Sequence, residues 1–369
     1  MKTVRVRLDK RTYEILIQFG ILNQAGKWIR NVFPGSHAVI VSDQTVSRLY
    51  GARVQNALEK EGFQTSIHMV PDGENSKSSE QLQALYDAFL RVGLKRDGLV
   101  IALGGGVVGD LAGFAAATFL RGVPLVQIPT TLLAQVDSSV GGKVGINHPL
   151  GKNLIGSFYQ PKCVLIDPEV LQTLPPRELW AGAGEVIKYA LIRDGDLFRL
   201  LESHLEKLFR LEEMDLLESV ITRCCQIKAW VVEQDETETE LRRILNFGHT
   251  LGHALEAETQ YRYFRHGETV VYGMQWATQL SCSMGLISEK DSTRIQSVLE
   301  RFPLPPVPKF VTPEGLMKRI GVDKKQTATG LRVVLLKRIG KASIVPAKEL
   351  DTITHMWLEG IRYGQKNKK

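Results

Sequence analysis

The stretch LVIALGGGVVGD, residues 99–110, joins a fully apolar run to a glycine-rich turn. A short apolar run that ends in turn residues is typical of a strand buried on both faces of a parallel sheet. Gly104, Gly106 and Gly109 have the G-x-G-x-x-G spacing that lets a backbone approach a pyrophosphate at the start of a helix. The motif alone is weak, because the next strand, PLVQIPTT, lacks the acidic residue usually found about 20 residues later. The stretch is therefore either a phosphate-binding turn or simply a tight one.

The segments before this turn also alternate between strand and helix patterns. A period of two predicts strands at VRVRL (4–8), YEILIQF (13–19), HAVIVSD (37–43) and GFQTSIHMV (62–70). Helical spacing predicts helices over 45–61 and 78–93, the second with Ser78 and Gln81 in capping-box positions. This alternation predicts an α/β fold with a Rossmann-like parallel sheet wrapped by helices.

The pattern changes at about Pro175, after which helical spacing predominates. It covers residues 175–192, 216–236, 246–258 and 268–285, and a short strand pair (331–340 and 342–346) precedes a C-terminal helix. We therefore expect an α/β domain over residues 1–173 and a mostly α-helical domain over 174–369. The active site is expected in the cleft between the two domains.

Composition excludes several classes of protein. With 369 residues, 43% hydrophobic and 24% charged, the chain is typical of soluble globular proteins. No apolar run approaches the roughly 20 residues of a membrane span, and MKTVRVRLDK does not resemble a signal peptide. We expect a cytoplasmic protein with no membrane partner.

Charge and cysteine content are equally ordinary. The net charge of +7 is dispersed and lacks interleaved aromatic residues, so no nucleic-acid partner is expected. The four cysteines, Cys163, Cys224, Cys225 and Cys282, have no metal-binding spacing. They are interpreted as free, buried thiols in a reducing compartment.

Two histidines lie four residues apart in NFGHTLGHALEAE, residues 246–258. His249 and His253 therefore share one face of a helix. Thr250 stands where a zinc protease would have glutamate, which excludes the H-E-x-x-H motif. A single helical histidine is more often a hydrogen-bonded core residue than a metal ligand.

Two further residues favour a metal site. His266 begins the next predicted helix, and Glu185 lies in the apolar segment AGAGEVIKYALI, where an unpaired carboxylate would be costly. One carboxylate with two imidazoles is a catalytic zinc pattern that leaves a coordination position open. Lys188, three residues after Glu185, could pair with this carboxylate or contact a substrate oxygen, and a simple buried ion pair is the alternative.

Polar residues also gather at other turns. Asp43 ends a predicted strand, where its carboxylate could accept a ribose hydroxyl, and PDGENSK (71–77) places acidic and basic groups before another helix. The glycine-rich segment 132–158 contains Asp137, Lys143, Asn147, Lys152 and Asn153. Such groups in a loop-rich segment favour substrate recognition.

With these residues in view, the sequence resembles the 3-dehydroquinate synthase family over nearly its whole length. The likeness is carried, in order, by PDGENSK, GGGVVGDLAGF, FLRG, QIPTTLLAQVDSSVGGKVGIN, GKNLIGSF, AGAGEVIKYALI, LRRILNFGHTLGHALEA, HGETVVYGM and DKK. The sequence departs from the usual family pattern in two small ways. Val144 stands where the family usually has threonine, and the residues that lead up to Glu185, AGAGE (181–185), replace commoner variants. Neither removes a group that the chemistry needs.

The resemblance implies an NAD-dependent and zinc- or cobalt-dependent lyase of the shikimate pathway, which leads to aromatic amino acids. It would convert 3-deoxy-D-arabino-heptulosonate 7-phosphate, a sugar acid phosphate, into 3-dehydroquinate and phosphate. The implied steps are transient oxidation by NAD, elimination of phosphate, re-reduction, ring opening and intramolecular aldol closure. NAD would be recycled.

The resemblance also implies roles for individual residues. The implied metal ligands are Glu185, His249 and His266. The implied catalytic residues are Lys188, His253, Asp137 and Asn246, and the substrate-binding residues are Lys143, Asn153, Lys228, Arg242 and Arg121. The implied NAD contacts are Asp43, Asp72, Gly73, Glu74, Asn75, Ser76, Lys77, Gly105, Gly106, Val107, Val108, Gly109, Asp110, Thr130, Thr131, Lys143, Lys152, Val170, Leu171, Gln172 and Thr173.

Arg121 matches an arginine that reaches the phosphate from a neighbouring subunit, which implies a homodimer. Either Lys324 or Lys325 is also implied to contact the phosphate. Two enzymatic alternatives stay open: another NAD- and metal-dependent sugar phosphate cyclase, or a metal-dependent polyol dehydrogenase, which would release NADH. A non-enzymatic basic scaffold would leave Glu185 and the histidines without a purpose.

Overall fold

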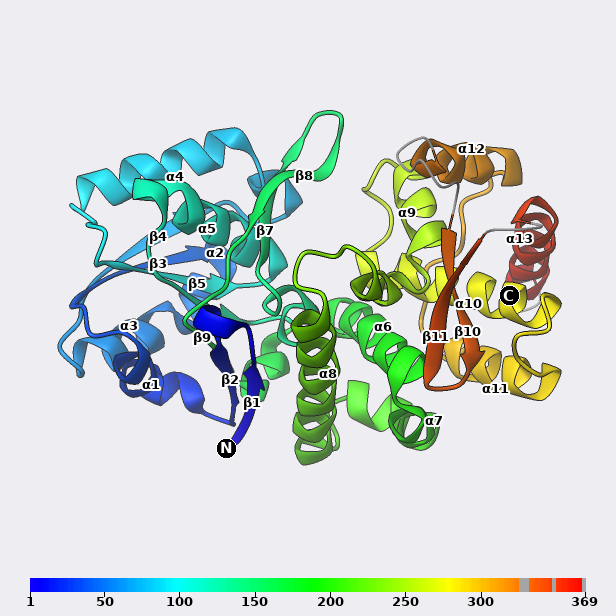
Figure 1. The fold of residues 1–369 in the computed structure, drawn as a ribbon, viewed down its shortest axis with the longest axis horizontal. Coiled ribbons are helices and arrows are strands. Elements are labelled where there is room, and N and C mark those ends of the chain that lie inside the picture. The colour runs from blue at the N-terminus through cyan, green and yellow to red at the C-terminus, as the bar shows by residue number, and fades with distance from the viewer. Residues whose placement is uncertain (325–331, 347–349, 367–369) are drawn as a thin grey trace. The chain divides into compact units, whose positions relative to one another are not determined.

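The computed structural model describes residues 1–324, 332–346 and 350–366, and the chain divides into two compact units (Figure 1). The first unit comprises Met1–Pro175 and Leu211–Thr237, and the second comprises Pro176–Arg210 and Glu238–Lys369. The sequence placed all of residues 174–369 in the second domain. In the structure, residues 211–237 belong to the first unit instead. This segment contains helix α8 (Met214–Gln234), which packs against strand β1 (Lys2–Val6) and so belongs to the first unit.

A seven-stranded sheet forms the centre of the first unit. Its strand order is β1-β2-β9-β6-β5-β3-β4. Besides β1, the strands are β2 (Tyr13–Ile17), β3 (His37–Asp43), β4 (Gln64–Val70), β5 (Leu99–Gly104), β6 (Leu125–Pro129) and β9 (Cys163–Ile166). All neighbouring pairs are parallel except β1 and β2, which are antiparallel. The predicted α/β class is confirmed, with a mixed and mostly parallel sheet.

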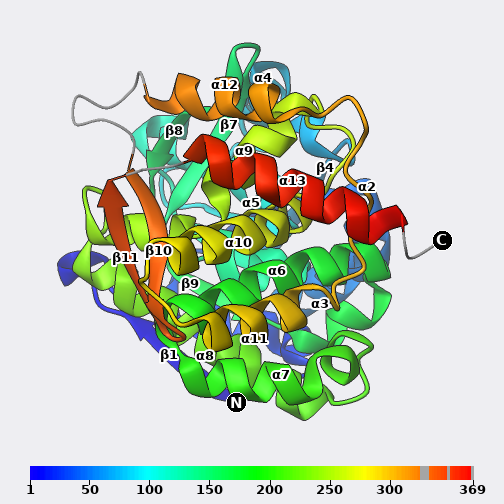
Figure 2. The same cartoon turned by 90° about the vertical axis from the view of Figure 1, so that its right-hand side faces the viewer.

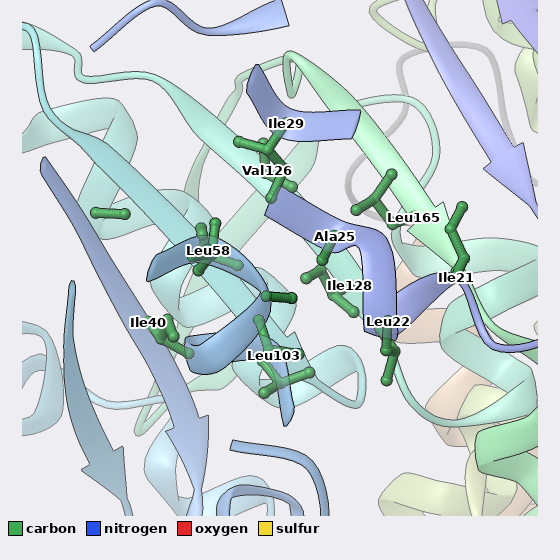
Figure 3. Close-up of a cluster of buried hydrophobic side chains, with 14 of the residues drawn as sticks. Ile21, Leu22, Ala25, Ile29, Ile40, Leu58, Leu103, Val126, Ile128 and Leu165 are labelled. Carbon is green, nitrogen blue, oxygen red and sulfur yellow. The ribbon is translucent and has the colours of Figure 1, made fainter. Parts of the chain in front are cut away.

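Helices cover both faces of this sheet (Figure 1). They are α1 (Ala25–Val32), α2 (Gln44–Val46), α3 (Ala52–Glu59), α4 (Ser79–Arg91) and α5 (Gly106–Thr118). Side chains alternate along β3, so that Ile40 joins the core under α1 and α3 while Val39 and Val41 join the core under α4 and α5. Figure 3 shows Ile40 and Leu103 beside Leu58 of α3. Burial on both faces explains the apolar run in β5.

Two local expectations differ from the structure. The helix expected over 45–61 is interrupted by a π-helical turn, Ser47–Gly51, which contains the poor helix former Gly51. The segment 132–158 is not a loop: after a π-helical turn, Ala134–Ser138, it forms a hairpin of β7 (Lys143–His148) and β8 (Gly151–Phe158). Gly145 of β7 pairs with Gly156 of β8. Such glycines interrupt the alternation of polar and apolar residues by which a strand is predicted from sequence.

The second unit is mostly helical, as expected. Its elements are α6 (Pro176–Arg193), α7 (Gly195–Phe209), α9 (His249–Glu258), α10 (His266–Ser283), α11 (Glu289–Leu299), α12 (Pro313–Lys324), β10 (Arg332–Arg338), β11 (Lys341–Pro346) and α13 (Leu350–Lys366). Helix α10 is buried on almost all sides and contacts α6, α9, α11, α13 and β10 (Figure 2). It is therefore the core helix of this unit.

Among the described residues, no helix has both the length and the apolar character of a membrane span.

The cysteines differ in their expected reactivity. Burial raises the pKa of Cys163 and of Cys225 to about 12, so almost none of either thiol is ionised at neutral pH. Cys282 is only partly buried. We expect iodoacetamide to modify Cys282 in the folded protein and to leave Cys163 and Cys225 unmodified until urea unfolds it. Peptide mass spectrometry measures this, and equal labelling of Cys163 and Cys282 before unfolding would contradict it.

Candidate active site

The nucleotide-binding candidates of the first unit lie at one edge of its sheet. Strands β4, β3, β5, β6 and β9 are parallel, so their carboxyl ends point the same way. Asp72, Asp43, Gly105, Thr130 and the 3₁₀ helix Pro168–Thr173 follow these ends in that order. The connections run outward from β3 to β4 and in the opposite direction from β5 to β6 and β9. The gap between β3 and β5 is thus a topological switch point, where α/β sheets bind ligands.

The glycine-rich turn begins helix α5. Gly105 is the N-cap of α5, so N–H groups of the first helical turn lack intrahelical partners and favour an anion. A Cβ atom added to Gly105 would lie 3.0 Å from Thr131 Cγ2, and one added to Gly106 would lie 3.1 Å from Ser138 Oγ. A side chain at either position would therefore force its neighbour to shift by a few tenths of an ångström.

Two carboxylates flank this turn. Asp43 accepts a hydrogen bond from the Val46 N–H at 2.8 Å, and Thr45 Oγ1 donates to Asp72 Oδ2 at 2.7 Å. Burial raises the pKa of Asp43, whereas the hydroxyl of Thr45 lowers the pKa of Asp72. Thr130 Oγ1 is buried and has no hydrogen-bond partner among the described residues. These groups fit the hydroxyls of a ligand, to which carboxylates offer hydrogen-bond acceptors.

A polar network joins the turn before α4 to the β7–β8 hairpin. Lys77 is buried, and its Nζ donates to Asp110 Oδ2 at 2.6 Å and also to Asn153 Oδ1. Asn147 Nδ2 donates to Glu74 Oε1 at 2.8 Å, and Asn147 Oδ1 accepts from the Asn153 N–H at 2.9 Å. Burial raises the pKa of Asp110, and Lys77 opposes this change. The structure thus brings together candidates from distant parts of the sequence.

Other substrate candidates of the first unit lie on the hairpin and on α8. Lys228 Nζ donates to Asp137 Oδ1 at 2.6 Å and to the Asp137 carbonyl oxygen, which ties α8 to the turn before β7. Lys143 is exposed at the start of β7, and Lys152 Nζ lies 3.9 Å from Glu74 Oε1. Cations on this side of the first unit are suited to an anionic ligand.

Three side chains converge in the second unit. Glu185 comes from α6, while His249 and His266 are the first residues of α9 and α10. Both Nε2 atoms lie 3.7 Å from Glu185 Oε1, which is fully buried and has no hydrogen-bond partner in the part of the chain that the structure describes. Bonds of about 2.05 Å to a tetrahedral zinc ion place neighbouring ligands about 3.4 Å apart. The three residues therefore fit a metal ion closely.

The protonation of the site also suits a metal. His249 Nδ1 lies 3.1 Å from the Phe247 carbonyl oxygen, to which its N–H donates, leaving the Nε2 lone pair toward Glu185. Burial, followed by the nearby Lys188 and the other two histidines, holds the pKa of His249 well below its usual value. The imidazole is thus neutral, as a metal ligand must be. Lys188 Nζ bonds to the other oxygen of Glu185.

Close contacts between helices set this geometry. A Cβ atom added to Gly267 would lie 1.8 Å from the Ala181 carbonyl oxygen, so α10 touches α6 one turn before Glu185. A Cβ atom added to Gly273 would lie 1.7 Å from the Gly248 carbonyl oxygen, which brings the start of α9 onto α10. The two contacts hold the helices that carry the three candidate ligands.

Further candidates surround the three residues. The ring of His253, which is exposed, lies 5.3 Å from that of His249 and 6.0 Å from that of His266. Arg242 is 1% exposed in the 3₁₀ helix Leu241–Asn246, and Asn246 Nδ2 donates to Glu238 Oε1 at 3.2 Å. The two histidines of one helical face therefore differ, since His249 is buried and His253 is accessible.

Some candidates lie apart from these groups. Arg121 is exposed just beyond the C-terminal end of α5, a helix of 13 residues and about 20 Å. It therefore lies far from Gly105 of its own chain. Lys325 and the side chain of Lys324 lie outside the described residues. The sequence interpretation missed Glu256, which contacts His266, although a carboxylate in the apolar stretch HALEA was an available signal.

Solved structures define the class of protein. A 2-deoxy-scyllo-inosose synthase, complexed with carbaglucose-6-phosphate, NAD+ and Co2+, has a TM-score of 0.87 at 27% identity and covers 96% of this chain and 100% of its own. The 2-epi-5-epi-valiolone synthase of Streptomyces hygroscopicus, with NAD+ and Zn2+ bound, has a TM-score of 0.88 at 28% identity, covering 97% and 99%. A glycerol dehydrogenase of Schizosaccharomyces pombe, at 17% identity and a TM-score of 0.68, covers 96% and 91% and shares the fold alone. The fold is therefore that of the sugar phosphate cyclases.

Sequence comparison narrows this class. Models of the N-terminal and C-terminal parts of 3-dehydroquinate synthase match residues 67–181 and 182–326. The 3-dehydroquinate synthase of Pelobacter propionicus is 46% identical over 356 residues, and that of Desulforamulus reducens is 47% identical over 355. Each match covers 96% of this chain and 99% of the relative. The chain belongs to the 3-dehydroquinate synthase family and is a cyclising carbon–oxygen lyase.

Proposed function

We propose that the chain converts 3-deoxy-D-arabino-heptulosonate 7-phosphate into 3-dehydroquinate and phosphate. NAD would bind at the carboxyl edge of the sheet, and one zinc or cobalt ion would bind Glu185, His249 and His266. The observation that carries the proposal is the convergence of these three side chains in a chain that the two family models match over residues 67–181 and 182–326. When bound, the metal polarises a substrate hydroxyl and NAD accepts and returns a hydride.

The NAD contacts inferred from the sequence are retained in this proposal. Gly105 and Gly106 would receive the pyrophosphate at the start of α5, and Asp43 would accept a ribose hydroxyl. The buried, unpartnered hydroxyl of Thr130 supports a ligand at the neighbouring strand end.

Cations of both units would hold the anionic ends of the substrate. Lys143 and Asn153 would contact the phosphate, together with Arg121 from a second copy of the chain. The position of Arg121 at the far end of α5 supports this homodimeric arrangement. Arg242 and Lys228 would bind the carboxylate, because a guanidinium can donate two parallel hydrogen bonds to it.

The remaining catalytic candidates would move or hold protons. His253 is exposed one helical turn from His249, so it can exchange protons with a substrate while His249 stays neutral. Lys188 would orient Glu185 through their hydrogen bond and contact a substrate oxygen. Asp137 and Asn246 would orient the substrate by hydrogen bonds.

The test follows two products at once. The purified, metal-loaded protein is mixed with the heptulosonate phosphate and a catalytic amount of NAD, and both phosphate release and NADH absorbance are recorded. Phosphate released without net NADH is the expected result. Stoichiometric NADH without phosphate would identify a dehydrogenase instead. If neither phosphate nor NADH appears, this substrate is rejected and other sugar phosphates are assayed instead.

Replacement of Arg242 by lysine tests the carboxylate contact. We expect Arg242→Lys to raise KM for the substrate by about 10- to 100-fold, because a charge-assisted bidentate pair is lost. NAD affinity should stay unchanged, since the NAD candidates all belong to the first unit. Arg243→Lys, at the adjacent and partly exposed position, is the matched control. Steady-state kinetics and NAD titration measure both effects, and equal losses of substrate and NAD affinity would contradict the assignment.

A further inference from the structure

One buried carboxylate beside the three candidate ligands has no role so far. Glu256, on α9, is 6% exposed, and its Oε1 lies 2.9 Å from His266 Nδ1. His266 begins a different helix, α10, and its other ring nitrogen lies 3.7 Å from Glu185 Oε1. The imidazole of His266 is thus held between two carboxylates, one on each ring nitrogen.

We propose that Glu256 is a positioning residue that fixes the orientation and tautomer of His266 for metal binding. The 2.9 Å contact is a hydrogen bond in which Nδ1–H donates to the carboxylate, and this leaves the Nε2 lone pair directed at Glu185. A carboxylate on the outer nitrogen of a metal-bound histidine raises the basicity of the ligating nitrogen, and its loss costs about 10- to 100-fold in metal affinity. The inference rests on the proposed metal site.

The role of Glu256 complements that of the backbone at His249. There the Phe247 carbonyl oxygen accepts from Nδ1 within the same segment of chain. His266 is the first residue of its helix and is partly exposed, so it depends on a side chain of α9 for the same restraint. Each histidine therefore has an acceptor on Nδ1 and presents Nε2 to Glu185.

A different use of the same atoms would be a second cation site formed by His253, Glu256 and His266. The distances favour positioning over ligation. The Glu256–His266 separation of 2.9 Å is a hydrogen-bond length, whereas the two 3.7 Å separations around Glu185 are too long for hydrogen bonds and fit ligands of one tetrahedral ion. His253 is also exposed, while Glu185 is fully buried.

The chain offers a matched control on the same helix. Glu258 lies two residues after Glu256, so it faces another direction, and its Oε2 accepts from Arg319 Nε at 3.2 Å. Glu258→Gln removes a carboxylate and an ion pair from α9 without touching His266. Glu256→Gln preserves the side-chain volume and an acceptor for the Nδ1–H group but removes the negative charge. Glu256→Ala removes the acceptor and the charge together.

The experiment measures metal binding without turnover. Zinc affinity of the full chain is determined by competition with a chromophoric chelator, and the visible spectrum of the Co2+-loaded protein reports the geometry of the site. Thermal unfolding of the metal-free protein monitors the fold. The variants are Glu256→Ala, Glu256→Gln and Glu258→Gln, with Glu185→Gln and His253→Ala as tests of which cluster binds the ion.

We expect zinc affinity to fall about 10- to 100-fold in Glu256→Ala and less in Glu256→Gln, with an altered Co2+ spectrum in both. Glu258→Gln and His253→Ala should bind zinc like the unmodified protein. Unchanged affinity in both Glu256 variants, with loss in Glu185→Gln, would overturn the inference and leave the proposed site intact. So would a lower unfolding temperature of the metal-free Glu256→Ala protein with normal binding by Glu256→Gln, because that indicates a purely structural role.

Two outcomes would show that the ion lies elsewhere. Normal zinc binding by Glu185→Gln would reject the proposed metal site itself, and the inference would fail with it. A loss in His253→Ala as large as that in Glu256→Ala would place the ion among His253, Glu256 and His266, and would make Glu256 a ligand.

Discussion

Glu185→Gln should abolish metal binding and lower kcat/KM by more than about 10³-fold, because one of three protein ligands becomes a neutral amide. Glu185 Oε1 faces the Nε2 atoms of both candidate histidines and has no hydrogen-bond partner among the described residues. Metal analysis of the purified variant and the phosphate-release assay measure the two losses.

The same substitution should also destabilise the fold. Lys188 Nζ is buried and bonds to Glu185 Oε2, so the variant leaves a buried ammonium without its carboxylate. Breaking a buried pair in this way costs about 3–5 kcal/mol. Glu178→Gln is the control, since Glu178 lies on the same helix in a more exposed pair, 2.6 Å from Arg265, and such pairs contribute at most about 1 kcal/mol.

Thermal unfolding of the metal-free proteins separates these effects. A Glu185→Gln variant that is less stable and lacks metal fits the assignment. Retention of stoichiometric zinc together with near-normal turnover would exclude Glu185 as a ligand.

Gly267→Ala should lower the free energy of unfolding of the second unit by about 3 kcal/mol or more and disrupt the metal site. The added methyl group would lie 1.8 Å from the Ala181 carbonyl oxygen, a backbone atom that cannot turn aside. Helices α6 and α10 must then separate, which costs overpacking energy and pulls Glu185 away from His266.

Gly360→Ala provides the matched control for Gly267→Ala. Gly360 is also helical, but a Cβ atom there would have no neighbour within 4 Å among the atoms of other segments. Alanine should therefore be neutral or stabilise α13 by up to about 1 kcal/mol. Chemical denaturation and zinc content measure the outcome. A Gly267→Ala protein with the stability and zinc content of Gly360→Ala would show that the helix contact does not hold the site.

The local pattern of residues was enough to predict the fold class, the family and the candidate metal ligands of this protein. The apolar run in β5 with its glycine turn, the strand periods before it and the helical spacing after Pro175 predicted the α/β fold and the helical second half. The sequence motifs also indicated the family, and they contained the candidate metal ligands Glu185, His249 and His266. Such features depend on neighbours along the chain, so they can be read without a structure.

Other features depended on contacts between distant segments. Helix α8 has ordinary helical spacing, yet packing against β1 and the Lys228–Asp137 bond assign it to the first unit. Paired glycines concealed the β7–β8 hairpin. Only the folded structure distinguished the buried His249 from the exposed His253, and only it placed Glu256 on the outer nitrogen of His266. Burial and side-chain partners arise from the packing of whole helices, and the periodicity of one helix does not encode what another brings to it.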